Sequence, residues 1–140
     1  PAAEALGLLA GLCGPEVGAD VRACAAEALG SLRRPESAWV LLRVAAADPE
    51  GDIRATACHG VLRLLEAGTL DDHLEDILAR LGALQERGTD RYVVAYAAEG
   101  SHRAACRLRR GQGPGLSPAP TLVRWCEFGD GWASRGAAAR

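Results

Sequence analysis

Two metal-ligating side chains in this sequence stand at a helical spacing. His102 and Cys106 are four residues apart, so on an α-helix they would share one face and supply half of a tetrahedral zinc site. The other ligands would have to come from His73, Cys126 or an acid, at spacings that match no ligand pattern. The sequence therefore predicts no metal site and no cofactor.

The remaining reactive groups do not form a catalytic set. Cys58 and His59 are neighbours in the chain, so they point to different faces and cannot act together as nucleophile and base. The sequence contains no glycine-rich phosphate loop, no GxSxG and no HExxH. A run of four acids is typical of a first helical turn: Asp71, Asp72, Glu75 and Asp76. No catalytic residue is predicted, and the sequence does not indicate an enzyme.

Arginines near the C-terminal end could bind anions. Residues 1–102 carry nine arginines and sixteen acids, whereas residues 103–140 carry seven arginines and two acids. Four of these arginines are clustered and could hold phosphate, with Trp125 stacking on a base: Arg103, Arg107, Arg109 and Arg110. Because the whole chain has a formal charge of −2, a nucleic-acid partner is not favoured.

These groups are carried by a repeated pair of helices. DVRACAAEALGSL begins at Asp20 and DIRATACHGVLRL begins at Asp52, 32 residues later. The matched pairs follow one helical stripe: Val21 with Ile53, Ala25 with Ala57, Leu29 with Val61, and Leu32 with Leu64. Asp20 and Asp52 are placed to cap these helices. The sequence AAEALG also occurs twice, at 2–7 and 25–30, but the first copy lies in the leading helix of a pair and the second in a trailing helix, so that identity is coincidental.

A third helix pair is altered. Residues 70–88 predict a longer amphipathic helix, capped by Thr69 or Asp71, and residues 90–104 predict the helix that follows it. Aligning Val93 with Val21 puts Val94 in place of the arginine and Ser101 in place of Leu29 and Val61. Such divergence is typical of a terminal repeat, which packs on only one neighbour.

The pattern D-[VI]-R-A-x-A-[AC]-x-[AG]-[LV]-x-x-L after a proline-led helix resembles the HEAT-like repeat of the phycobilisome-lyase family. The resemblance covers residues 1–106, in units of about 1–34, 35–68 and 69–106. It implies an all-α fold, a short right-handed α-solenoid. It also implies that four residues bond to neighbouring repeats: Asp20, Arg22, Asp52 and Arg54.

A non-catalytic scaffold that binds another protein is the function we expect, and the chain is expected to be a fragment or terminal part of a larger array. Five residues are candidates for its binding face: Ala23, Glu27, Thr56, His59 and Glu99. The resemblance leaves two alternatives open, a bilin-lyase-like component and a nucleic-acid-binding module similar to the alkylpurine DNA glycosylases.

The C-terminal stretch, 107–140, is rich in glycine, proline and arginine and predicts a linker and a poorly ordered tail. Its apolar segment 121–128 is a candidate cap for the end of the solenoid, although the same composition would also result from out-of-frame translation. No membrane span is predicted. Five cysteines without a CxxC favour a reducing, cytoplasmic setting.

Overall fold

The computed structural model describes residues 2–88 and 90–111, which contain six α-helices, one 3-10 helix and no strand. The predicted all-α class is confirmed. The chain divides into two compact units, here called unit 1 (Pro1–Leu70) and unit 2 (from Asp71 onward). No helix in the described ranges combines the length and apolarity needed to cross a membrane.

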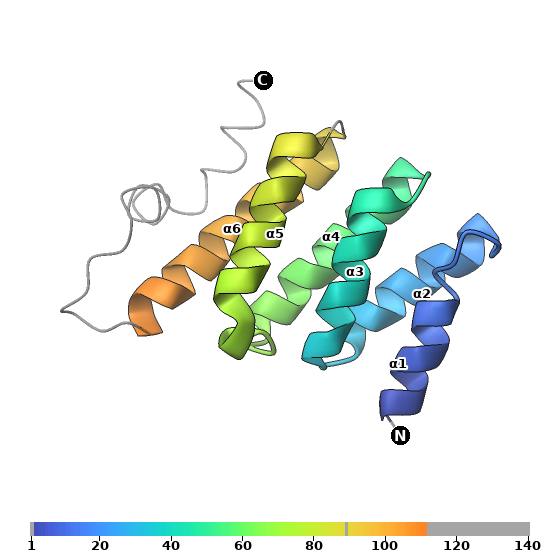
Figure 1. The fold of residues 1–140 in the computed structure, drawn as a ribbon, viewed down its shortest axis with the longest axis horizontal. Coiled ribbons are helices and arrows are strands. Elements are labelled where there is room, and N and C mark those ends of the chain that lie inside the picture. The colour runs from blue at the N-terminus through green and yellow to red at the C-terminus, as the bar shows by residue number, and fades with distance from the viewer. Residues whose placement is uncertain (1, 89, 112–140) are drawn as a thin grey trace. The chain divides into compact units, whose positions relative to one another are not determined.

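Unit 1 is a bundle of four helices: α1 (Ala2–Gly11), α2 (Ala19–Ser31), α3 (Pro35–Ala47) and α4 (Gly51–Glu66). Helix α4 packs on both α2 and α3, and α1 contacts α2 and α3 (Figure 1). The core consists of fully buried alanine and branched aliphatic side chains, among them Ala25, Leu29, Leu41, Ala57, Val61, Leu64 and Leu65. The stripe predicted for α4 is therefore its buried face.

Two glycines bring the backbones of α2 and α4 into contact. A Cβ atom placed on Gly30 would lie 2.9 Å from the Cα of Gly60. A Cβ on Gly60 would lie 3.0 Å from Leu41 Cδ1 and 3.4 Å from the Cα of Gly30. Both glycines are buried. A side chain at Gly30 would meet backbone, which cannot swing aside, so the spacing of the two helices depends on its absence.

Unit 2 contains η1 (Asp71–His73), α5 (Leu74–Arg87) and α6 (Arg91–Gly111), with α5 packed against α6. Ser101 is fully buried in α6, at the position that aligns with Leu29 and Val61. Its hydroxyl accepts a hydrogen bond from Gln85 Nε2 on α5 at 3.0 Å. A polar contact therefore replaces the aliphatic contact expected at this place, without leaving the hydroxyl unpaired.

Several predicted helix ends are wrong. Helix α5 starts at Leu74, after the 3-10 turn, so neither Thr69 nor Asp71 caps it. Helix α6 continues to Gly111, so residues 107–111 are helical and do not belong to a linker. One contact that holds this extension is the ion pair between Arg107 Nη1 and Asp71 Oδ1, at 2.6 Å. The predicted tail from 112 onward, with the candidate cap at 121–128 and Trp125, lies outside the described residues.

The predicted aspartate caps are also wrong. Helix α2 begins after Gly18 and α4 after Glu50, so Asp20 and Asp52 are each the second helical residue, and no side chain caps either helix. Both aspartates instead place a carboxylate in the positive first turn. Asp90 is the acid that does cap, because its Oδ1 accepts from the backbone N–H of Tyr92 at 2.8 Å.

Val21 was expected on the buried stripe, but 45% of its surface is exposed. Its counterparts Ile53 and Val93 are only 4% and 2% exposed. Helix α1, which contacts α2, buries none of its own residues, so this end of unit 1 is less tightly packed than the repeat alignment predicts.

Candidate functional site

A buried ion pair joins the start of α2 to the end of α3. Arg22 Nε donates to Asp48 Oδ2 at 3.0 Å, and Arg22 Nη2 donates to Asp48 Oδ1 at 3.3 Å. The exposed fractions of the two side chains are 9% and 3%. The third nitrogen, Nη1, donates to the carbonyl oxygen of Val17 at 2.6 Å. The guanidinium thus forms a two-bond fork with the carboxylate, and hydrogen bonding to Asp48 raises the pKa of Arg22.

Asp48 also organises the turn between α3 and α4. Its Oδ1 accepts from the backbone N–H of Glu50 at 2.9 Å, and its carbonyl oxygen accepts from Arg54 Nη1 at 2.7 Å. The α1–α2 and α3–α4 turns are therefore tied together at one end of unit 1, through Arg22 and Asp48.

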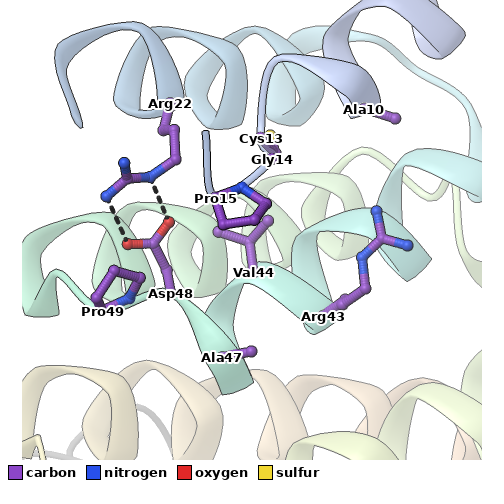
Figure 2. Close-up of a pocket in the computed structure, with 10 residues that line it drawn as sticks. All are labelled: Ala10, Cys13, Gly14, Pro15, Arg22, Arg43, Val44, Ala47, Asp48 and Pro49. Atoms are coloured by element: carbon purple, nitrogen blue, oxygen red, sulfur yellow. Dashed lines mark hydrogen bonds and ion pairs between the residues drawn. The ribbon is translucent and has the colours of Figure 1, made fainter. Parts of the chain in front are cut away.

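A pocket of about 320 Å³ lies beside this ion pair. It is lined by the end of α1, the turn that follows, and the last turns of α3: Ala10, Cys13, Gly14, Pro15, Arg22, Arg43, Val44, Ala47, Asp48 and Pro49. Figure 2 shows the Arg22–Asp48 pair on one side of Val44 and the Arg43 side chain on the other. Most of the lining is aliphatic, so the pocket suits a small apolar group.

The polar groups of the pocket favour binding over catalysis. Arg43 is exposed and makes no hydrogen bond or ion pair with the described residues, so its charge remains available to an anion. Burial raises the pKa of the Cys13 thiol, an effect that Arg43 partly opposes. A thiol with a raised pKa is protonated at neutral pH and is a poor nucleophile. The pocket can therefore hold an apolar group next to an anion, and it contains no activated thiol.

Cys58, which the sequence analysis considered as a nucleophile, is unsuited to nucleophilic chemistry. It is 1% exposed, and burial raises its pKa from 9.0 to about 12. Its neighbour His59 is exposed on the other side of α4. Cys58 is a small core residue.

The raised pKa of Cys58 predicts a loss of stability in alkali. Between pH 9.0 and about 12 the unfolded chain releases the thiol proton and the folded chain keeps it. Over this range the thiol of Cys58 should lower the free energy of unfolding by about 1.4 kcal/mol for each pH unit. Below pH 9.0 both states keep the proton, so the stability contributed by the protonated thiol is fully retained. Urea unfolding at several pH values across the range measures the slope. Cys58→Ala should have a shallower slope, and equal slopes in the two proteins would contradict the assignment.

The residues predicted for a binding face are divided between the two units. In unit 1, Glu27 and His59 are exposed, Ala23 is half-buried, and the hydroxyl of Thr56 donates to the carbonyl oxygen of Asp52 at 2.9 Å. In unit 2, Glu99 Oε1 is paired with Arg103 Nη2 at 2.7 Å. None of these residues lines the pocket beside Arg22.

The predicted anion-binding arginines separate into two groups. Arg103 and Arg107 are bound to the carboxylates of Glu99 and Asp71, whereas Arg109 and Arg110 are exposed at the end of α6. Among the described residues, therefore, two of the four arginines have no carboxylate partner and could bind an anion.

A second cavity, of about 270 Å³, is formed within unit 2 by Leu108 and the acidic segment 71–76. One of its carboxylates, Asp71, is neutralised by Arg107. Within residues 2–88 and 90–111, no three His, Cys, Asp or Glu side chains are arranged to hold a metal ion.

Three residues of the pocket beside Arg22 could not be selected from the sequence. Asp48 stands before a proline in a turn, which indicates the turn but not its buried partner 26 residues away. Cys13 and Arg43 belong to no recognisable sequence pattern, because only the packing of α1 against α3 brings them to one cavity.

Comparison of the chain with family models, curated proteins and solved structures found no match.

Proposed function

We propose that the chain is a non-catalytic, HEAT-like scaffold that binds a protein partner at the end of unit 1 formed by α1 and the α1–α2 turn. The observation that carries this proposal is exposed apolar surface: 71% of Leu8, 41% of Leu12 and 45% of Val21 face solvent. The N–H of Leu12 donates to the carbonyl oxygen of Leu8 at 3.0 Å, so the two leucines share one helical face. An exposed apolar pair such as Leu8 and Leu12, with Val21 exposed at the start of the neighbouring helix α2, is typical of a protein-interaction site.

The adjoining pocket supports a partner of defined chemistry. Ala10 and Cys13, from the same end of α1 as Leu12, line the pocket, and Arg43 offers the free positive charge. A partner segment would place an aliphatic side chain in the pocket and a carboxylate against Arg43. The apolar part supplies affinity, and the ion pair fixes the orientation.

The repeat architecture remains part of the proposal. The paired helices of unit 1, the D-[VI]-R spacing and the core stripe of α4 support stacking of the pairs as a right-handed α-solenoid. The cytoplasmic location that we also propose rests on the five cysteines without a CxxC. The buried Arg22–Asp48 pair supports it as well, since it ties one helix pair to the next.

Charge placed on the exposed apolar surface should weaken partner binding and leave the fold intact. Leu8→Glu and Val21→Glu alter exposed positions, where the free energy of unfolding usually changes by less than about 0.5 kcal/mol. We expect each to weaken binding by tenfold or more, on the order of 1.4 kcal/mol. Partners captured by the wild-type chain are purified and titrated by calorimetry against both variants.

Ala3→Glu is the matched control, because it adds the same charge to an exposed position elsewhere on α1. It should bind like the wild type. The proposal fails if no purified protein binds the wild-type chain saturably, or if the Leu8 and Val21 variants bind as tightly as the control.

A further inference from the structure

We infer that Cys106 of α6 is a reactive thiol that exchanges with small anionic disulfides and is thereby a site of reversible modification. It is a half-exposed cysteine, and its sulfur lies 3.8 Å from Nε2 of His102, one helical turn earlier. This site is in unit 2 and is independent of the binding surface proposed for unit 1.

The environment of His102 indicates which ring nitrogen carries the proton. The side chain is only 8% exposed, and its Nδ1 is buried without a hydrogen-bond partner among the described residues. A buried N–H without an acceptor is far rarer than a bare ring nitrogen, so the neutral ring has its proton on Nε2. Nε2 then donates toward the Cys106 sulfur, which favours the thiolate.

The same geometry argues against a metal at this pair. A histidine that binds a metal through Nε2 normally donates its other N–H to a second group. Here Nδ1 would carry that hydrogen with no acceptor in reach. The pair is therefore better suited to thiol chemistry than to the zinc half-site that its spacing suggests.

Arginines flank Cys106 along α6. Arg103 is three residues before it, and Arg109 and Arg110 are three and four residues after it, which are the neighbouring positions on a helix surface. Arg109 and Arg110 are exposed and can also contact carboxylates of an incoming reagent. Of the acids near these turns of α6, Glu99 and Asp71 are bound to Arg103 and Arg107, whereas Asp72, Glu75 and Asp76 line a cavity with Leu108. These carboxylates and the negative end of α6 oppose a thiolate, and the direct donor and the exposed guanidinium groups of Arg109 and Arg110 favour it.

Cys24 provides an internal comparison. It is exposed on α2, with Asp20 four residues before it and Glu27 three residues after it. Accessibility alone would make Cys24 the faster thiol, whereas charge would make Cys106 the faster one. The two explanations therefore predict opposite orders of reaction within one molecule.

The reaction is a thiol–disulfide exchange. The Cys106 thiol loses its proton to solvent, and the thiolate attacks one sulfur of the reagent. A new bond forms between that sulfur and Sγ, the reagent's S–S bond breaks, and the second sulfur leaves as a thiolate. The reagent disulfide is the oxidant: its leaving sulfur accepts the two electrons that Sγ of Cys106 gives up in forming the mixed disulfide.

Two probes of opposite charge test the inference on the full chain carrying Cys126→Ser. The chain is treated with the anionic disulfide 5,5′-dithiobis(2-nitrobenzoate) or with cationic cystamine, and modification of each cysteine is followed by peptide mass spectrometry. With the anionic probe we expect Cys106 to react about tenfold faster than Cys24. With cystamine the ratio of the two rates should fall severalfold or reverse.

Variants separate the contributions of the neighbours. The exposed pair Arg109→Gln and Arg110→Gln should lower the rate of Cys106 with the anionic probe and leave its rate with cystamine unchanged or higher. His102→Gln should slow both probes at Cys106 and neither at Cys24. If His102→Gln unfolds the chain, the arginine variants still decide. The inference is overturned if Cys24 reacts faster than Cys106 with the anionic probe, or if the rate ratio is the same for both probes.

Discussion

Gly30→Ala is expected to destabilise the protein, although alanine is the better helix former. The new Cβ would lie 2.9 Å from the Cα of Gly60, closer than carbon atoms approach without displacement, and both positions are buried. Alanine gains about 1 kcal/mol in helix propensity over glycine. Forcing α2 and α4 apart costs more, so we expect a net loss of about 1–3 kcal/mol in the free energy of unfolding. Gly30→Val should lose more still.

Gly7→Ala is the control, because Gly7 is also helical but a Cβ there meets nothing within 4 Å. Without a clash only the propensity acts, and we expect stabilisation of up to about 1 kcal/mol. Urea unfolding of both variants shows whether each substitution raises or lowers the free energy of unfolding. A Gly30→Ala protein as stable as Gly7→Ala would mean that α2 and α4 do not touch at the glycines.

Asp48→Ala is the second substitution with a large expected effect. It leaves the buried guanidinium of Arg22 without the carboxylate that receives two of its donors, and it removes the acceptor for the N–H of Glu50. Breaking a buried ion pair by deleting one partner is strongly destabilising. We expect the midpoint of urea unfolding to fall by on the order of 1 M with an unchanged slope. Glu36→Ala, which breaks the exposed pair with Arg34, should change the midpoint far less.

The double variant Arg22→Met with Asp48→Ala distinguishes loss of a partner from loss of packing. With the charge also removed, no uncompensated guanidinium remains, so the double variant should be more stable than Asp48→Ala alone. A double variant less stable than either single variant would show that the two side chains act chiefly through packing.

The sequence predicted the class of the fold because helical periodicity is a local property. The stripe Ile53, Ala57, Val61 and Leu64 is buried throughout. Val21 follows the same pattern and is exposed, because burial depends on the packing around each position as well as on periodicity. Helix ends were less predictable, since an aspartate near a helix start is equally compatible with a cap and with the second helical position.

The glycine contact and the pocket could not be predicted, because they depend on contacts between distant parts of the chain. Gly7 and Gly30 are indistinguishable as helical glycines in the sequence, yet only Gly30 lies against another backbone. Similarly, Arg22 was expected to bond to a neighbouring repeat, but nothing in the sequence marked Asp48 as its partner. The alignment of repeats gives equivalent positions and not the contacts between them.

The bonds of Arg22 have a further consequence for recognition. Its three guanidinium nitrogens hold Asp48 on the α3–α4 turn and Val17 on the α1–α2 turn, so two walls of the pocket are braced before anything binds. A partner would then not have to order these turns, and the entropic penalty of association would fall mainly on its own segment and on Arg43. Preorganisation of this kind lets a small contact area support specific binding, and association does not have to wait for these turns to become ordered.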